Sequence, residues 1–440
     1  MHNIFEYLTN FNEIILWGYL GLGMVISFGL YFSFRARWIQ VFHFWTACKH
    51  FISCMKHSTY AEDEEHGVSP IKLFFATIGG AIGIGNVAGV ALAIQIGGPG
   101  ALVWVLLVAL LGMIIKYSEV YLGIKYRRHI PGKKGYEGGP MYFLQKAFPK
   151  YTWIAYVMAF LLCIYGVEIY MFNVVKYSFQ TNFHLNPHVV MGLFLILIFL
   201  GVFGGVERVG AINTILIPGF VILYVVMTLW IIFQEIHLLP ELLKTILKSA
   251  FTGHAAIGGF TGSTFLLTLS KGLSAGAYSG DIGIGYASII HSETRFKEPS
   301  KQASLTILGI FLDTFVVCMC TILLILVTGV WKLNTDSSLL VQEALSHYFP
   351  YMDYFMPFCL FILGYSTITS YFVAGIKCAD FIWPSYGKKF YMVYGLCAFI
   401  IFSFIETRYA FAIMSTAGGL LMVINLAGLM KLRKDIVYKV

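Results

Sequence analysis

Two glycine-rich segments of the chain contain the residues best suited to binding chemistry. The first, Ala81–Asn86, reads AIGIGN, and the second, Asp281–Tyr286, reads DIGIGY. Each glycine weakens a helix by about 1 kcal/mol relative to alanine, so we expect both segments to interrupt helices. An interrupted helix presents N–H groups that attract carboxylates and C=O groups that attract cations. The pattern therefore predicts two places where backbone atoms bind a small charged ligand, although glycines also allow close helix packing without any break.

Polar side chains accompany both segments. Asn86 ends the first segment with a side-chain carbonyl that can bind a cation or cap the next half-helix. Asp281 opens the second segment, and an ionisable group in a nonpolar environment usually marks a pathway or a partner. Asp281 can alternatively cap the following half-helix or pair with Lys271. Lys116 and Glu119, one turn apart, are explained by an ion pair between them or by snorkelling.

The composition indicates the environment of these residues. Of 440 residues, 58% are hydrophobic and 12% are charged, whereas soluble domains have about 25% charged residues. Such a chain must face lipid, so it is an integral membrane protein. The net charge of +8 comes from basic residues that flank apolar runs, which favours a role in topology over nucleic-acid binding. The eight cysteines form no CxxC pair or metal-ligand cluster, and we expect no cofactor.

Eleven apolar runs are long enough to be membrane spans, since a spanning helix needs roughly 20 residues. This predicts an all-α polytopic membrane protein. The runs lie near 14–34, 71–96, 101–125, 152–177, 188–206, 210–234, 260–290, 303–330, 353–383, 389–405 and 409–430. Between them, His237–Phe251 is expected to form an interfacial helix, and Asp336–Phe349 is a second candidate.

The basic residues predict the orientation of the chain. With the N-terminus outside, 21 of the 30 Lys and Arg residues fall in inner loops and five in outer loops. This asymmetry places the C-terminus in the cytoplasm. We expect a multi-pass protein of the plasma membrane, which in bacteria is the inner membrane. The two glycine-rich segments then run in opposite directions, as expected for an inverted repeat.

Several motifs resemble the alanine or glycine:cation symporter family. Phe74–Arg127 contains GxGNxAGVA, then GGPGA, then GMxxKxxE followed by KYR. Looser matches follow at Gly138–Tyr142, Phe203–Val209, Gly309–Thr314 and Ser366–Ile368. Together the matches extend over about residues 70 to 430. The first block is highly specific to the family.

The resemblance implies a leucine-transporter-like fold. In that fold, two repeats of five helices are inverted relative to each other, and here one extra N-terminal helix precedes them. It also implies a secondary transporter, not an enzyme, which uses sodium or protons to drive symport of a small amino acid such as alanine or glycine by alternating access. We expect a monomer in the lipid bilayer. The expected segments are 1–68 (first helix and cytoplasmic linker), 69–236 (first repeat), 237–258 (extracellular helix and linker), 259–432 (second repeat) and 433–440 (tail).

The same resemblance assigns site residues. The substrate-binding candidates are Gly83, Ile84, Gly85, Tyr278, Ser279, Asp281, Gly283 and Tyr371. The sodium candidates are Gly79, Ile82, Asn86, Ser366 and Thr367. Hydroxyl groups and carbonyls suit a hard cation, but Ser and Thr in helices also bond to their own backbone.

The chain departs from the family pattern within the expected pocket. The usual TVGTGN is AIGIGN here, and the usual FSNEAGMG is replaced by Tyr278–Gly285. Tyr371 aligns with the usual Trp, and Met171 with the usual Gln. Fewer hydroxyls weaken the argument for sodium, and the short Asp281 side chain favours protons. The choice between the two cations therefore stays open.

Other classes of function fit less well. An uncoupled facilitator and a transporter-like receptor remain alternatives to a symporter. The sequence contains no HExxH, GxSxG or Walker A motif. Gly83–Gly85 also lacks the third glycine and the strand–helix setting of a dinucleotide-binding fingerprint. These absences argue against a membrane enzyme.

Overall fold

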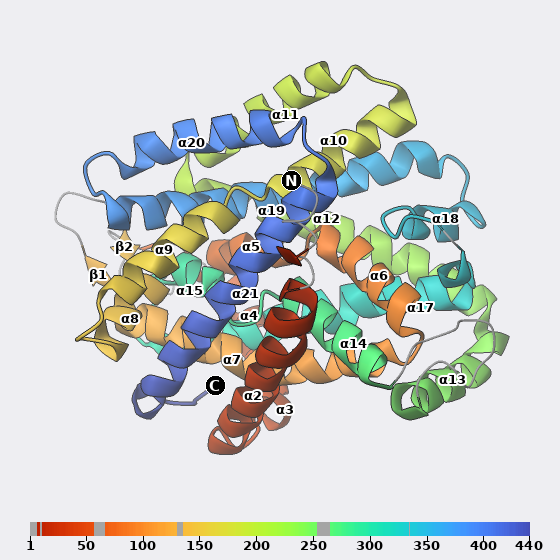
Figure 1. Ribbon diagram of the computed structural model, residues 1–440. Coiled ribbons are helices and arrows are strands. Elements are labelled where there is room, and N and C mark those ends of the chain that lie inside the picture. Colours follow the sequence, from red (N-terminus) through yellow and green to blue (C-terminus); the bar gives the residue numbers. More distant parts are fainter. Residues whose placement is uncertain (1–6, 9–10, 57–66, 130–134, 253–264, 334) are drawn as a thin grey trace.

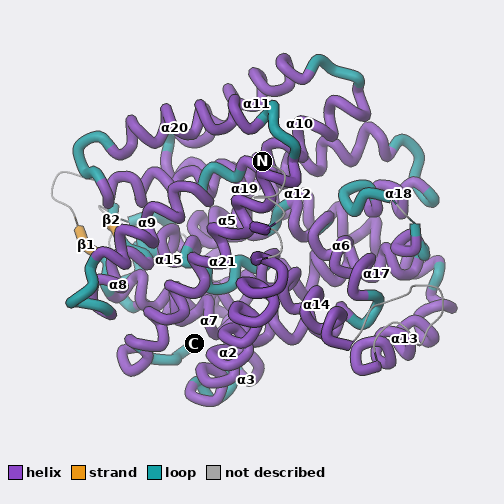
Figure 2. The backbone as a smooth tube through the Cα atoms, in the orientation of Figure 1, coloured by secondary structure: helices purple, strands orange, loops and turns teal. Residues whose placement is uncertain are grey.

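The structure, a computed structural model, describes the chain except for a few short stretches. The residues outside the described part are 1–6, 9–10, 57–66, 130–134, 253–264 and 334. Nearly all of the described backbone is helical, and its only strands form a small pair beside α8 (Figures 1 and 2). The prediction of an all-α architecture is confirmed.

Seven helices or joined helices of the described part are long and apolar enough to cross a membrane. The bent pair α5 (Pro70–Ala81) and α6 (Ala88–Gly97) raises this number to eight when it is taken as one span. The seven are η1 (Phe11–Gly21) with α2 (Leu22–Arg35), α7 (Ala101–Lys125), α9 (Trp153–Tyr165) with α10 (Ile169–Phe183), α12 (Gly205–Gln234), α16 (Pro299–Ile310) with η5 (Phe311–Cys318) and α17 (Met319–Val327), α19 (Met352–Ile382), and α21 (Thr407–Lys431).

Helices also occupy the other three predicted runs. They are α11 (Pro187–Val202), α20 (Gly387–Phe402), and α14 (Phe265–Ser279) followed by α15 (Tyr286–His291). The start of the seventh run, 260–264, lies outside the described residues. Each of the eleven predicted spans thus coincides with a helix or a broken helix.

The connecting elements are short. They comprise α3 (Ile39–Phe42), α4 (Phe44–Lys56), the antiparallel strands β1 (Arg128–His129) and β2 (Tyr136–Glu137), α8 (Pro140–Ala147), α13 (Leu239–Thr252), α18 (Leu340–Ser346), and the 3₁₀ turns η2 (Ile84–Asn86), η3 (Ile236–Leu238), η6 (Val330–Lys332) and η7 (Arg433–Asp435). Helix α13 coincides with the first predicted interfacial segment, and α18 lies within the second. Both segments therefore contain the expected helices.

The helix contacts repeat between the two halves, as an inverted repeat requires. Helix α7 packs against α14, and its counterparts α16 and α17 pack against α5 and α6. Helix α12 packs against α19, while its counterpart α21 packs against α9 and α10. Likewise, α11 contacts α19 and α10 contacts α20. The extra helix, η1 with α2, packs outside this arrangement on α21, α7 and α14.

Both glycine-rich segments interrupt their helices. At the first break, α5 ends at Ala81, and the half-helices meet at an angle of 57°. At the second break, Asp281, Gly283 and Gly285 have left-handed φ angles of 48°, 77° and 93°. Glycine adopts this conformation readily, whereas Asp281 is strained by it. The predicted pair of breaks is present.

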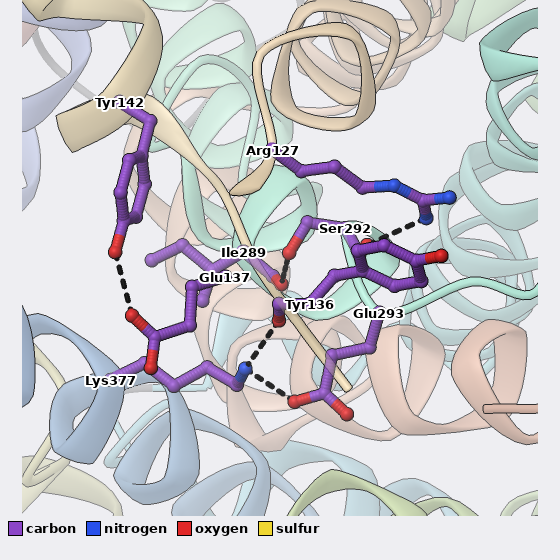
Figure 3. Close-up of polar contacts among 8 residues, drawn as sticks. All are labelled: Arg127, Tyr136, Glu137, Tyr142, Ile289, Ser292, Glu293 and Lys377. Atoms are coloured by element: carbon purple, nitrogen blue, oxygen red, sulfur yellow. Dashed lines mark hydrogen bonds and ion pairs between the residues drawn. The ribbon is translucent and has the colours of Figure 1, made fainter. Parts of the chain in front are cut away.

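Arg127 anchors the chain just after α15 (Figure 3). Its guanidinium donates hydrogen bonds to the carbonyl oxygens of Ser292 (2.9 Å), Thr294 (2.6 Å) and Phe296 (3.1 Å). A planar fork of donors suits this set of acceptors, which a single ammonium cannot match. The end of the second broken helix is thereby tied to the end of α7.

We expect Arg127→Lys to lower the stability of the protein. Lysine can replace only part of the three hydrogen bonds, so the loss should be about 2 kcal/mol. The measurement is the thermal unfolding midpoint of the purified protein in detergent. Arg128→Lys, at the exposed neighbouring position, serves as the control and should change stability by less than about 0.5 kcal/mol. Equal midpoints for both variants would rule out the anchoring role.

Candidate functional site

The two breaks meet inside the helix bundle. A β-carbon placed on Gly85 would lie 3.8 Å from the ring of Tyr278 and 4.0 Å from Cα of Ser279. Below them, the Tyr286 hydroxyl donates to the carbonyl oxygen of Ala76 at 2.9 Å, which joins α15 to α5. Predicted residues from both segments are therefore in contact, as a shared binding site requires.

Thr367 lies against the first break. Its hydroxyl donates to the carbonyl oxygen of Gly79 at 3.2 Å. A β-carbon on Gly83 would lie 2.6 Å from Thr367 Oγ1, so only glycine fits at that position without rearrangement. Ser366 instead donates to Leu363 of its own helix at 2.9 Å, which matches the alternative considered for it. The hydroxyl of Thr367 thus faces the break, and that of Ser366 bonds within α19.

Asn86 bridges the first break to η5. Its Oδ1 accepts a hydrogen bond from the Gly83 amide at 2.9 Å. Its Nδ2 donates to Asp313 Oδ1 at 2.7 Å and contacts Cys318 Sγ at 3.2 Å. The Gly83 amide is therefore engaged locally, and the capping role of Asn86 is observed within the break itself. Asp313, with 1% of its surface exposed, also lies at the site; the sequence placed it in the family-like motif Gly309–Thr314 and left its role open.

Asp281 lies buried at the second break, with 5% of its surface exposed. It is not the cap of α15, because Gly285 occupies that position. Asp281 Oδ2 and the hydroxyls of Tyr278 and Tyr371 make no hydrogen bond of good geometry to a described residue, but the Tyr371 hydroxyl interacts with the Asp281 carboxyl group and the Tyr278 hydroxyl with that of Tyr165. The Tyr371 ring stacks on Tyr286 with centroids 4.0 Å apart. Buried polar atoms without partners are rare in proteins, so this group is suited to a ligand.

Lys116 and Glu119 hold the second break rather than snorkelling. Lys116 Nζ donates to the Gly280 carbonyl at 2.9 Å, and only 3% of this residue is exposed. Asn425 Nδ2 donates to Glu119 Oε2 at 2.9 Å and to the Gly283 carbonyl at 2.8 Å. Snorkelling was the wrong explanation, because both side chains are buried, whereas the expected electrostatic interaction between Lys116 and Glu119 is present. The sequence feature that could have indicated this role is the KxxE pair, because it lies on a helix that packs against a predicted break.

Glu168 is a further site residue without a predicted role. It lies between α9 and α10 with a left-handed φ of 54°, and 2% of it is exposed. Its carboxyl group interacts electrostatically with that of Asp281. In the sequence, Glu168 is one acid within an apolar run, a pattern that does not identify its neighbours. A third irregular backbone segment thus contributes to the site.

A cavity of about 450 Å³ leads to the breaks from one side of the bundle. Gly85 and Tyr278 line its inner end, Trp17 and Tyr170 line its walls, and Arg408 lies among the residues at its mouth. On the opposite side, Lys377 forms an ion pair with Glu293 and donates to the Tyr136 carbonyl at 3.3 Å (Figure 3). In the same region, Tyr142 donates to Glu137 at 2.7 Å. One side is open toward the breaks, and polar contacts tie the other side together.

We expect Lys116→Met to destabilise the protein by about 3 kcal/mol. Methionine keeps the length of the side chain but removes the donor to Gly280 and leaves buried carboxyl groups without a compensating charge. Thermal unfolding in detergent measures the effect. Lys125→Met removes an exposed lysine of the same helix and should have little effect. An unfolding midpoint for Lys116→Met at or above that of the parent protein would contradict this role of Lys116.

Comparisons with known proteins agree with this architecture. The model of the "Sodium:alanine symporter family" matches residues 1–440. The "Sodium/alanine symporter AgcS" of Methanococcus maripaludis is 27% identical over 97% of this chain and 95% of its own length. The "Probable sodium/glutamine symporter GlnT" of Bacillus subtilis is 27% identical over 99% of this chain and 90% of its own length.

Among solved structures, that of MhsT in complex with L-phenylalanine has a TM-score of 0.51 at 17% identity. The matched region covers 82% of this chain and 89% of the MhsT chain. This similarity shows the leucine-transporter-like fold. Together with the family match over the whole length, it confirms that the protein is a membrane transporter and not an enzyme. The chain belongs to the sodium:alanine symporter family.

Proposed function

We propose that the protein is a cation-coupled symporter that imports a small amino acid, such as alanine or glycine, by alternating access. The observation that carries this proposal is the arrangement of the two opposed breaks. They meet at the end of a cavity on one side, and the Lys377–Glu293 pair lies on the other. A site at the midpoint of an inverted repeat, reached from one side at a time, is what alternating access needs.

The distribution of Lys and Arg supports the direction of transport. It places the N-terminus outside the cell, so the end of α6 and the start of α21 also lie outside. Residues of both segments line the cavity, among them Ile96 and Thr407. The cavity therefore opens outward in this orientation. Import across a plasma membrane, which in bacteria is the inner membrane, follows from this proposal.

The chemistry of the breaks suits a zwitterion. Asp281 offers a carboxylate for the ammonium group, and the first turn after the break offers backbone N–H groups for the carboxylate. The Gly83 amide is already bonded to Asn86, so Ile84 and Gly85 are the candidates for that contact. Glycine at 85 leaves room beside Tyr278, which favours a compact substrate. Two relatives are named for different substrates, alanine for AgcS and glutamine for GlnT, so the substrate of this protein has to be measured across several amino acids.

Oxygen atoms beside the first break suit a sodium ion. The Thr367 hydroxyl and the Gly79 carbonyl lie 3.2 Å apart, a separation compatible with two oxygens that share one cation. The Ser366 hydroxyl bonds to the Leu363 carbonyl of its own helix at 2.9 Å, so Thr367 is the hydroxyl that faces the break. Hard cations prefer oxygen ligands, and free carbonyls at helix breaks supply them. Ile82 and Asn86 complete the set that we assign to this ion.

Transport in proteoliposomes tests the proposed function. Radiolabelled alanine and glycine are offered with a sodium gradient, with a proton gradient, or with neither. Accumulation above the external concentration only under an imposed gradient would support symport. Equilibration without accumulation would identify an uncoupled facilitator, and binding without any flux would identify a receptor. Either result would overturn the proposal.

Thr367→Val should raise the sodium concentration needed for half-maximal uptake by about tenfold or more. Valine keeps the shape of the side chain but removes the oxygen that faces Gly79, and one lost ligand costs about 1.4 kcal/mol or more. Thr369→Val is the matched control, because the Thr369 hydroxyl bonds to Tyr365 of its own helix at 2.7 Å. Uptake is measured against sodium concentration. Equal sodium dependence in the two variants would remove Thr367 from the ion site.

Asp281→Asn should abolish uphill uptake, because the amide removes the negative charge that we assign to substrate ammonium. Initial rates of uptake should fall at least about 100-fold, since loss of a charged contact in a buried site costs about 3 kcal/mol or more. Asp353→Asn, at an exposed position at the start of α19, should transport normally. Normal accumulation by Asp281→Asn would leave this residue with a purely structural role.

A further inference from the structure

Two buried acids of the core, Glu168 and Asp281, have a strained backbone and interact electrostatically. Glu168 and Asp281 have left-handed φ angles of 54° and 48°, and both are almost fully buried. Such a backbone conformation costs about 1–3 kcal/mol in a non-glycine residue and is concentrated at functional sites. Glu168 Oε2 and Asp281 Oδ2 make no hydrogen bond of good geometry to a described residue, and the same holds for Glu119 Oε1. Asp281 interacts with Lys116 and the Tyr371 hydroxyl, whereas in the described part of the chain Glu168 has only the Asp281 carboxyl group as a charged neighbour.

The other two buried acids in the described part of the bundle each accept a hydrogen bond from a side chain, although Glu119 Oε1 has no donor. Asn425 donates to Glu119, while Asn86 and Thr314 donate to Asp313. Lys116, the one buried Lys or Arg in the described part of the chain, interacts electrostatically with Glu119, Asp281 and Asp313. Glu168 has instead a second acid as its charged neighbour. A buried charge without a counter-charge is very costly, so Glu168 requires a positive partner or a proton.

The remaining ionisable neighbours cannot meet this requirement. The groups that interact with Glu168 are Tyr165 of α9, Tyr170 of α10, Tyr278 of α14, Asp281 of the second break, Tyr286 of α15, Tyr371 of α19 and Tyr391 of α20. Asp281 additionally faces Lys116, Glu119 and Asp313. Tyrosines ordinarily ionise near pH 10 and are neutral at physiological pH. The neutral hydroxyls can bond to a carboxyl group but cannot balance its charge.

We propose that Glu168 and Asp281 form a proton-binding pair whose proton is transported together with the substrate. The inference rests on the proposed function and adds a coupling ion to it. Glu168 takes up one proton from the outward cavity, which Tyr170 lines two residues away. With the proton on Glu168, the pair keeps one negative charge on Asp281, which the substrate ammonium group balances while the carrier reorients. The proton then leaves on the cytoplasmic side. No covalent bond of the substrate changes, and one proton enters for each one released.

A proton gradient imposed across proteoliposomes tests this pair. Sodium is replaced by choline on both sides of the membrane. The proton concentration inside the proteoliposomes is made ten times lower than that outside. With one proton per substrate, wild-type protein should accumulate alanine about tenfold. Glu168→Gln resembles the protonated acid and cannot release a proton, so its accumulation ratio should fall to about 1. Counterflow, which needs only the loaded carrier to reorient, should continue in this variant.

If Glu168→Gln is inactive in every assay, two further measurements still test whether Glu168 and Asp281 bind the transported proton. Glu168→Asp retains an ionisable group and should still accumulate alanine on a proton gradient. Addition of alanine to wild-type proteoliposomes should make a weakly buffered external medium more alkaline, as followed with a pH-sensitive dye. Glu241→Gln, an exposed position on α13, is the control for the same chemical change and should match the wild type.

The possible results separate the two proposals. Wild-type accumulation that depends on sodium alone, without alkalinisation, would overturn the proton-binding pair and leave the symporter intact. Proton-driven accumulation in Glu168→Gln equal to that of wild type would overturn it as well. If wild-type protein neither exchanges nor accumulates alanine or glycine under any gradient, the proposed function itself fails.

Discussion

The structure depends on how unpaired backbone groups are satisfied within a nonpolar bundle. Two helices are interrupted in the core, and every exposed N–H or C=O there needs a partner. Thr367 and Asn86 bond to the first break, while Lys116 and Asn425 bond to the second. Three of these partners come from three other helices, α19, α7 and α21, and Asn86 belongs to the first break itself. The breaks are therefore possible only because the surrounding helices place polar side chains next to the unpaired backbone groups.

This requirement links stability to transport. The groups that hold the breaks also bring charge into the core, where Lys116 faces several acids. A change in the position of one half-helix must alter these contacts, so in the proposed symport the movement of the breaks would be coupled to the binding of a cation. The Lys377–Glu293 pair lies at the side opposite the cavity, where such movement would open a path (Figure 3). Coupling in this account arises from charge balance around mobile backbone.

Local sequence patterns predicted much of the fold but less of the site. Apolar length located the spans, and glycine density located both breaks, because these signals lie within one helix. The partners of the breaks could not be predicted in the same way. Lys116 and Glu119 have a pattern that an exposed ion pair would share, and Glu168 is a single acid in an apolar run. The roles of Lys116, Glu119 and Glu168 depend on which distant helix each side chain faces. The hydroxyls of Ser366 and Thr367 point in different directions for the same reason.

An experimental structure with bound alanine tests the central claim most directly. The account predicts density for the amino acid between the two breaks, with its carboxylate near the backbone of Ile84 and Gly85 and its ammonium group near Asp281. Both helices should remain interrupted in that complex. Density confined to the outer cavity, or continuous helices through either glycine-rich segment, would contradict the account.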